Sequence, residues 1–524
     1  MDRNRRASDA RRWRTALLVT AGATLLRLVF AALLPLFPDE TYYWDWSRGS
    51  HLAAGYFDHP PMIAVLVRAG TSLFTALGVP PSPLAVRFFA VLAGGMAALA
   101  ASAIARRLAG GLAARTAAIV FAVMPLAASG LVLATPDAPL LAASAVGLYC
   151  VVRALESPGH SGAALLWWSA AGVALGLAFA SKYTSILLPI TITAAVLIRP
   201  SLRARLREPG PYLACVLATL VFLPVIQWNA AHEWISFRFQ LQHGLGAPKG
   251  SAIKRELDLI GGQLALVSPI LFALGAYSVW NSLRRTADDI RFALAVVAVG
   301  SWLFFVYSAL RRSVEANWPA PSYIPGVALL ASMYSSPGVS RAWRRWVNRG
   351  IALAAVMVAV IYVHALAPIL PLLPARRDPL ARSAGWDRVG TQVSNLQSAL
   401  TAGSSSRAWV AADRYQEVSE LAFHSAGRPT VFCLCLSGRH NQYDLWPGFA
   451  QTARPGDALI ALVDERPDSV THETVARLAP YFSSVQRDAL APLLRGRDTV
   501  TVRRLWVLQG WRGGWPARTE WAAR

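Results

Sequence analysis

Charged residues are scarce in this chain of 524 residues: Asp, Glu, Lys and Arg make up 15%, whereas 55% of the residues are hydrophobic. Soluble globular proteins carry about 25% charged residues, so the composition excludes an ordinary soluble enzyme as well as a disordered chain. Cysteine is also scarce, and four cysteines in a chain of this length exclude a disulfide-based fold. The sequence contains no P-loop, no GxGxxG between a strand and a helix and no HExxH, so a nucleotide-driven pump or a nucleotide-sugar enzyme has no support.

Lysine is almost absent, because 48 of the 51 basic residues are arginine. The formal net charge of +22 would indicate a nucleic-acid partner in a soluble protein. The apolar excess indicates a membrane protein instead, so we expect membrane lipids and no nucleic acid among the partners. The distribution of charge along the chain then reports membrane orientation.

Eleven apolar runs approach the length of a membrane span, which needs about 20 mostly apolar residues to cross a bilayer core of about 30 Å. The runs are 15–36, 84–105, 116–134, 138–152, 163–180, 184–198, 211–228, 259–280, 292–310, 319–334 and 351–370. The first follows six arginines but lacks a small-residue cleavage site, so we interpret it as a retained anchor. The sequence therefore predicts a mainly α, polytopic membrane protein with about 11 transmembrane helices.

Basic residues are distributed unequally between the two sets of connections. The N-terminus and the connections after even-numbered runs carry 21 arginines and 6 acidic residues, whereas the opposite set, before the tail and with Arg87 at the start of the second run included, carries 10 basic and 9 acidic residues. The positive-inside rule makes the first set cytoplasmic. We therefore expect a multi-pass protein of a bacterial inner membrane, with a cytoplasmic N-terminus and a periplasmic C-terminal region.

The last part of the chain differs in character, and we place a boundary between a transmembrane domain, 1–374, and a periplasmic α/β domain, 375–524. Short β-prone runs at 408–412, 430–435, 458–463 and 499–508 alternate with helix-like stretches at 415–424 and 472–481. Cys433 and Cys435 fall on one face of a predicted strand. Two buried thiols are favoured there over a reactive pair.

Candidate chemistry gathers at the outer ends of the predicted spans, where ionisable residues near membrane depth are functional candidates. Asp39 and Glu40 end the first run and are followed by the aromatic stretch TYYWDW. Two carboxylates beside aromatic rings suit a general base next to a stacked sugar. The alternative is an interfacial aromatic belt with solvated acids.

Two further acidic sites stand next to prolines. Asp58 and His59 precede two prolines in YFDHPP, and Asp137 lies in TPDAPL between the third and fourth runs. Proline restricts the backbone, so each carboxylate would be held at a defined turn. Capping of a helix or a hairpin would explain Asp58 and Asp137 as well, but leaves His59 unexplained.

Three outer connections supply the remaining candidates. Lys182 and Tyr183 lie in SKYTS, where a compact ammonium group suits a phosphate and interfacial anchoring is the alternative. WNAAHEWISFRFQLQHG contains His243, but its ionisable residues are too loosely spaced to define a metal site unaided. The connection RRSVEANWPAP carries Arg311, Arg312, Glu315 and Asn317.

One family of membrane enzymes has similar motifs in the same order. The chain resembles the bacterial branch of the dolichyl-phosphate-mannose protein mannosyltransferase family in PDETYYWDWS, YFDHPP, TPDAPL, SKYTS, WNAAHEWISFRFQ and EANWPAP. Its relatives include the aminoarabinose and galacturonic acid transferases that modify lipid A, all of the GT-C fold. The resemblance covers most of residues 30–325 and extends loosely to DRYQ and NQYDLWPG in the tail.

The resemblance implies an inverting enzyme that uses a polyprenyl-phosphate sugar at the outer face of the membrane. By position it makes Asp39 the general base or substrate-orienting carboxylate, while Glu40, Asp58 and Asp137 would position sugar and acceptor. Aminoarabinose transferases have Glu followed by Lys where this chain has Asp58 and His59, so Lys182 would supply the missing phosphate-binding charge.

The remaining polar candidates are our own assignment. We expect the donor-phosphate and substrate-binding set to be His59, Lys182, Tyr183, Arg311, Arg312, Glu315 and Asn317. His243 loosely matches a metal-binding histidine of those relatives. Asp58 and His243 would then hold a divalent metal ion where the reaction uses one, and no other cofactor is expected.

We therefore predict a glycosyltransferase that moves a sugar from a polyprenyl-phosphate donor to a hydroxyl of lipid A, a lipopolysaccharide core, another glycolipid or a protein. The alternative is a lipid or sugar-lipid transporter, or flippase. Such folds usually contain inverted repeats and polar groups near the membrane centre, whereas the polar clusters here crowd one face. A purely structural role would leave the three aspartate clusters unused.

Overall fold

The computed structural model describes residues 2–248, 250–284, 288–368, 374–402, 405–466 and 472–519. The chain divides into two compact units. The membrane unit comprises Met1–Leu33 and Ala53–Ala367, and the C-terminal unit comprises Leu34–Leu52 and Pro368–Arg524. The C-terminal unit therefore includes a short segment from near the start of the chain, in addition to the region after 374 that the sequence marks as a domain.

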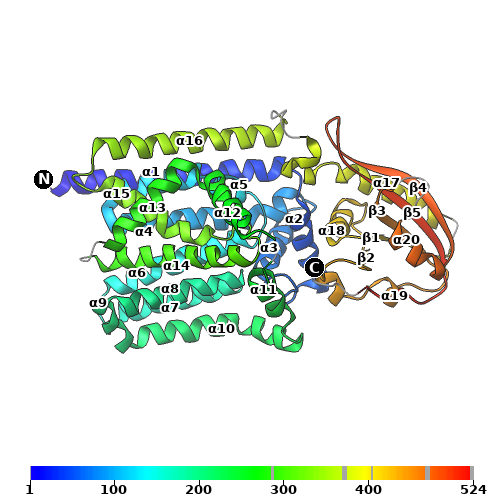
Figure 1. Ribbon diagram of the computed structural model, residues 1–524, viewed down its shortest axis with the longest axis horizontal. Helices are drawn as coiled ribbons and strands as arrows, with labels where there is room; N and C mark the ends of the chain where they lie inside the picture. Colours follow the sequence, from blue (N-terminus) through cyan, green and yellow to red (C-terminus); the bar gives the residue numbers. More distant parts are fainter. Residues whose placement is uncertain are drawn as a thin grey trace. The chain divides into compact units, whose positions relative to one another are not determined.

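The membrane unit is built from helices, and the long ones run alongside one another (Figure 1). They are α1 (Asp2–Leu33), α3 (Met62–Ala76), α4 (Pro83–Val123), α5 (Pro125–Gly130), α6 (Asp137–Glu156), α7 (Gly162–Phe179), α8 (Leu187–Ile198), α9 (Pro200–Arg203), α10 (Pro209–Ala231), α11 (Ile235–Leu245), α12 (Ala252–Val267), α13 (Pro269–Arg284), α14 (Asp289–Arg311), α15 (Tyr323–Ser335) and α16 (Arg341–Leu366). In the described chain, seven helices are long and apolar enough to cross a membrane, or up to nine if each of two bent pairs is one span. The mainly α, polytopic fold is confirmed, whereas the predicted number of eleven spans is not.

Helix α4 contains the predicted span 84–105 and the first part of the predicted span 116–134, because the arginine-containing segment between them stays largely helical. Its backbone leaves helical geometry at Ala109 and Gly110, where Gly110 has a φ of 76°. At the next residue, Gly111, a Cβ atom would come within 2.5 Å of the carbonyl oxygen of Asp9 in α1. Glycine permits both the left-handed backbone and this close approach of two helices.

The apolar run 259–280, which the sequence predicts as one span, is broken by a sharp bend. Helix α12 ends at Val267 and α13 begins at Pro269, with a bend of 101° between them. Pro269 has no N–H group with which to continue the helix and disfavours helical geometry at Ser268, which has a φ of 78°. A second bend, of 110°, follows Ile198 and precedes Pro200. A hydropathy pattern reports apolar length and carries no information on such bends.

The C-terminal unit contains a five-stranded sheet in the order β2-β1-β3-β5-β4. Strand β1 pairs in parallel with β2 and with the central β3, and β5 pairs antiparallel with β3 and β4. The strands are β1 (Ala408–Ala412), β2 (Val431–Cys433), β3 (Ala458–Asp464), β4 (Phe482–Arg495) and β5 (Asp498–Trp511), and the helices are α2 (Pro38–Trp46), α17 (Trp386–Thr401), α18 (Tyr415–His424), α19 (Phe449–Thr452) and α20 (Glu473–Leu478). The predicted α/β character is confirmed. The long β4 is the strand that the sequence pattern missed, because few of its side chains are buried.

Cys433 and Cys435 form a disulfide bond, so the prediction of two buried thiols is wrong. Strand β2 ends at Cys433, and the φ of 49° at Cys435 turns the chain out of the strand. Leu434, between the two cysteines, packs instead into the core of the sheet with Phe432 and Leu459. The bridge therefore closes a small loop at the end of the strand.

Candidate active site

A cluster of three polar side chains joins separate segments of the membrane unit. The ammonium Nζ of Lys182 donates a hydrogen bond of 2.8 Å to Oδ1 of Asp137, and Nδ2 of Asn317 donates one of 2.7 Å to Oδ2. Asp137 opens α6, Lys182 precedes the 3-10 turn η2 (Tyr183–Ile186), and Asn317 precedes the turn η4 (Ala320–Ser322). Three residues predicted from three different motifs thus meet at one carboxylate.

Burial of this cluster costs free energy, because the charged side chains of Asp137 and Lys182 are removed from water and are each only 8% exposed. A buried ion pair stabilises a fold weakly, since the cost of removing both charges from water offsets most of their attraction. Ionisable groups buried inside a unit of membrane-spanning length therefore indicate a site of chemistry more than a source of stability. Both oxygens of Asp137 accept hydrogen bonds, so this carboxylate orients Lys182 and Asn317.

The turn that contains Asp58 and His59 lies against the turn after α7 that contains Lys182. The backbone N–H of Met62, which begins α3, donates a hydrogen bond of 3.0 Å to the carbonyl oxygen of Ala180, two residues before Lys182. The carbonyl oxygen of Asp58 accepts a hydrogen bond from the side-chain amide of Gln240 in α11. Asp58 is buried. The structure therefore brings the predicted YFDHPP and SKYTS motifs together, and it adds Gln240, which sequence reasoning missed.

Tyr183 faces α10 and α11. Its hydroxyl lies 2.9 Å from Oγ of Ser236 and accepts a hydrogen bond of 3.3 Å from Nδ2 of Asn229. Asn229 and Ser236 are fully buried. Tyr183 thus links the turn after α7 to the WNAAHEWIS motif, whose asparagine gave no separate signal in the sequence.

His243 lies on α11, one turn after Gln240, and stacks on Phe239 with 5.6 Å between ring centroids. The ring of Trp318 lies 5.5 Å from it on another segment. A protein-bound divalent cation ordinarily takes three or more protein ligands, but the described residues contain no group of three His, Cys, Asp or Glu side chains able to hold one. These residues alone do not fit a metal centre at Asp58 and His243.

The two predicted arginines end helix α14 and pack against the end of α11. Nε of Arg311 donates a hydrogen bond of 3.2 Å to the carbonyl oxygen of Leu245. The guanidinium group of Arg312 lies close to Gly246. A Cβ atom added at Gly246 would lie 2.7 Å from Nη2 of Arg312. Glu315 is exposed in the following turn and does not join the Asp137 cluster. The structure thus separates Glu315 from Asn317, although they belong to one motif.

Asp39 and Glu40 lie in the first turn of α2, within the C-terminal unit. Asp39 is exposed, whereas Glu40 is completely buried, and its Oε2 accepts a hydrogen bond of 2.9 Å from the backbone N–H of Phe37. Glu40 therefore caps the helix that Pro38 starts. This arrangement favours Asp39 over Glu40 as the group that can reach a substrate.

The aromatic stretch after Glu40 forms a core of the C-terminal unit instead of a sugar platform or a membrane belt. Tyr42 and Trp46 are at most 2% exposed, and Tyr42 packs against Tyr415 and Tyr443 with ring centroids 4.7 and 5.6 Å apart. Its hydroxyl also accepts a hydrogen bond of 2.7 Å from the backbone N–H of Gln442. The aromatic rings thus fix α2 to the rest of its unit.

Asp45, which the sequence did not single out, lies near the end of the same helix and is its second buried acid. It accepts hydrogen bonds from the hydroxyl of Tyr443 at 2.8 Å and from Nη1 of Arg48 at 3.1 Å. Burial, together with the negative charge of Asp45, raises the pKa of Tyr443 well above its ordinary value. Tyr443 therefore stays protonated and keeps donating to Asp45.

Comparison with known proteins agrees with this architecture. Residues 58–228 match the profile of the dolichyl-phosphate-mannose-protein mannosyltransferase family. The chain is 27% identical over 385 residues to the lipid A galacturonosyltransferase RgtD of Rhizobium johnstonii, an alignment that spans 73% of this chain and 78% of RgtD.

Solved structures show the same fold. ArnT from Cupriavidus metallidurans bound to undecaprenyl phosphate superposes with a TM-score of 0.63 at 17% identity, over 95% of this chain and 98% of ArnT. The archaeal oligosaccharyltransferase AglB from Archaeoglobus fulgidus superposes with a TM-score of 0.52 at 12% identity, over 86% of this chain and 69% of AglB. These matches confirm the GT-C fold and the family resemblance that the motifs predicted.

Proposed function

We propose that the protein is a multi-pass inner-membrane glycosyltransferase that transfers a sugar from a polyprenyl-phosphate donor to a hydroxyl group of a glycolipid. The observation that carries the proposal is the buried cluster of Lys182, Asp137 and Asn317 in a GT-C fold. Its polar groups stand at the ends of helices that are long enough to cross a membrane. The similarity to RgtD and to ArnT bound to undecaprenyl phosphate supports both the reaction class and the type of donor.

The cationic groups of the membrane unit would bind the donor phosphate. An ammonium group has three N–H donors, and Asp137 uses one of those of Lys182, so the others are oriented for a further acceptor. Arg311 and Arg312 add two guanidinium groups at the end of α14. Negative charge develops on the phosphate oxygen as the glycosidic bond breaks, and fixed cations stabilise that charge most strongly away from water.

Asp39 is the proposed general base. The acceptor oxygen forms a bond to the anomeric carbon while the bond between that carbon and the phosphate oxygen breaks, which inverts the configuration. The acceptor proton passes to the Asp39 carboxylate, and the polyprenyl phosphate leaves with the bonding electron pair. Asp39 is exposed and close to the N-terminus of α2, where a carboxylate is well placed.

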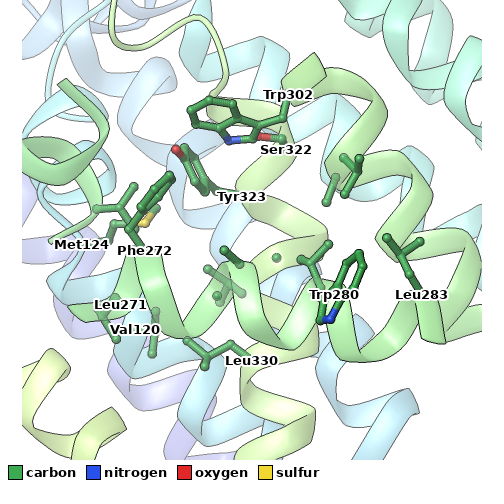
Figure 2. A pocket seen from close by; sticks show the side chains of 18 of the residues that line it. Val120, Met124, Leu271, Phe272, Trp280, Leu283, Trp302, Ser322, Tyr323 and Leu330 are labelled. Atoms are coloured by element: carbon green, nitrogen blue, oxygen red, sulfur yellow. The ribbon is translucent and has the colours of Figure 1, made fainter. Parts of the chain in front are cut away.

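An apolar cavity of about 410 Å³ in the membrane unit offers a place for the polyprenyl chain. Its walls come mainly from α13, α14 and α15, and Figure 2 shows Ser322 and Tyr323 beside Trp302, with apolar side chains around the rest. Trp280 and Leu303 line the cavity and are 56% and 62% exposed, so the cavity opens at the surface of the membrane unit. Burial of an isoprenoid chain there would stabilise the complex through the hydrophobic effect.

The test is transfer by the purified full-length protein in lipid nanodiscs. Radiolabelled polyprenyl-phosphate galacturonic acid is supplied with lipid A, and the products are a labelled lipid A and free polyprenyl phosphate in equal amounts. Movement of the unmodified donor across a vesicle membrane without these products would instead identify a flippase. Label found on protein, and none on lipid, would reassign the acceptor class.

The proposed orientation has a separate test. The excess of arginine on one set of connections supports a cytoplasmic N-terminus and a periplasmic C-terminal unit. Alkaline phosphatase fused after Arg376 is then active in intact bacteria, and the same enzyme fused after Arg349 is inactive. The reverse pattern would contradict the orientation without affecting the fold.

A further inference from the structure

The side chain of Tyr323 connects the wall of the apolar cavity to a buried glutamine behind it. The ring of Tyr323 lines the cavity, and Figure 2 shows it beside Trp302. The Tyr323 hydroxyl donates a hydrogen bond of 2.7 Å to Oε1 of Gln263 in α12, and Gln263 is completely buried. One residue therefore contributes an apolar ring to the cavity and a polar group to the interior of the membrane unit.

The side-chain amide of Gln263 has one orientation that satisfies its neighbours. Its Nε2 donates hydrogen bonds of 3.2 Å to the carbonyl oxygen of Leu259 and of 3.0 Å to that of Ala316. Backbone carbonyl oxygens only accept, so Nε2 must face them and Oε1 must face the Tyr323 hydroxyl. Loss of that hydroxyl would leave a buried acceptor without its donor, which disfavours this position of the amide.

Gln263 thereby holds the segment that leads into Asn317. Ala316, whose carbonyl oxygen it binds, is the residue before Asn317. The amide of Asn317 donates a hydrogen bond of 2.7 Å to Oδ2 of Asp137, whose Oδ1 accepts one of 2.8 Å from Lys182. A continuous series of hydrogen bonds and covalent bonds thus runs from the cavity wall to the proposed phosphate-binding ammonium group.

The position of the Tyr323 ring depends on what it packs against. The ring borders a cavity of about 410 Å³, so protein atoms pack on it less completely than on a ring inside a filled core. An isoprenoid chain bound in the cavity would pack against the ring on that side and gain dispersion contacts with it. A bound chain therefore favours the orientation in which the hydroxyl reaches Gln263.

We propose that Tyr323 and Gln263 are positioning residues that couple binding of the donor's isoprenoid chain to the orientation of Asn317. The inference rests on the proposed function, including the place of the chain in the cavity. The chain fixes the ring of Tyr323, the hydroxyl holds Gln263, and Gln263 holds the turn that carries Asn317. Binding energy from a remote part of the substrate then raises the rate of the chemical step as well as the affinity.

The experiment measures single-turnover transfer to lipid A by the full-length protein in nanodiscs. The donors are a long-chain polyprenyl-phosphate galacturonic acid and an analogue with two isoprene units. Each is supplied at saturation, and rates are taken per folded molecule, so the rate constants report the chemical step and not affinity or folding. We expect the wild-type rate constant to be about 5-fold or more higher with the long donor, a size typical of coupling between two sites.

The variant Tyr323→Phe keeps the ring in the cavity wall and removes only the hydroxyl. We expect its rate constant with the long donor to fall to that of the short donor, while the half-saturating concentration of the long donor changes little. Gln263→Met should likewise abolish the difference between the two donors, and the double variant should add nothing, because both substitutions break one series of contacts. The matched control is Tyr334→Phe, which removes a hydroxyl on the same helix that donates to Oδ1 of Asn348 at 3.3 Å and should leave both rates unchanged.

Three results would overturn the inference. One is a loss of rate in Tyr323→Phe by the same factor with both donors, which a merely structural role of the hydroxyl would produce. Another is an advantage of the long donor that Tyr323→Phe retains. The third is a wild-type rate constant that does not depend on chain length. A wild-type protein that transfers sugar from neither donor would instead refute the proposed function, so the two failures are distinguishable.

Discussion

Lys182 and Asp137 are 45 positions apart in the sequence, and their side chains meet at 2.8 Å inside the membrane unit. Asp137 accepts a second hydrogen bond from Asn317, which fills the other carboxylate oxygen. The lysine is therefore held in one orientation before a substrate arrives. A preoriented cation stabilises developing charge without reorganisation during the reaction.

The first prediction concerns this pair. Lys182→Ala leaves the buried Asp137 without a positive partner, so we expect a loss of about 3–5 kcal/mol of stability and a fall in kcat/KM for the donor. The double variant Lys182→Met, Asp137→Asn removes both charges and should recover the stability but not the activity. Thermal unfolding and the transfer assay measure the two effects separately. Lys254→Ala is the control, because that lysine is exposed on α12, and full activity of the double variant would contradict a role in phosphate binding.

The second prediction separates the two acids of α2. Asp39→Asn should fold normally and lower kcat about 100-fold or more, since removal of a general base has effects of that size. Glu40→Gln should keep most of the activity per folded molecule and lose about 1 kcal/mol of stability, because Glu40 caps the helix. Activity and unfolding are measured on the same preparations. Equal loss of activity in both variants, with both folded, would show that the exposed and buried acids act together.

The third prediction concerns the far end of the same helix. Tyr443→Phe removes the hydroxyl that donates to the buried Asp45 at 2.8 Å. We expect a loss of about 1–3 kcal/mol, because a buried carboxylate loses a hydrogen-bond donor, together with reduced kcat through the looser helix. Tyr212→Phe is a suitable control, since its hydroxyl bonds a backbone oxygen on an exposed part of the membrane unit. An unchanged unfolding temperature in Tyr443→Phe would contradict the anchoring role of this contact.

The fourth prediction tests the apolar cavity. Gly326 lines it, and a Cβ atom there would meet no atom within 4 Å, so Gly326→Phe can fill the space without a clash at the backbone. We expect a higher KM for long-chain polyprenyl donors and little change for donors with one or two isoprene units. Gly261→Phe is the matched control, because Gly261 also has open space around it but lies outside the cavity lining. A KM that rises equally for short and long donors would place the chain elsewhere.

Much of the architecture follows from the sequence, because apolar length and turn residues are local properties. Helix α18 and strand β1 have the predicted bounds. The sequence also marks the motifs of Lys182, Asp137 and Asn317 as candidate sites, each on its own. The sequence pattern does not reveal which motifs contact one another in the fold, because the hydrogen bonds of Asp137 join residues up to 180 positions apart. It also misjudged the aromatic residues after Glu40, because rings that cover a membrane interface and rings that pack a domain core have the same composition.

The inclusion of Leu34–Leu52 in the C-terminal unit bears on the order of assembly. During synthesis, the helix that carries Asp39 emerges first, whereas Ser419, Gln442 and Tyr443, which bind it, are made about 400 residues later. Until then its buried aromatic rings have no cover, and its proposed base has no fixed position. Catalysis with the proposed base therefore requires synthesis at least as far as Tyr443, so a nascent chain that ends before this residue would insert into the membrane without acting on the donor.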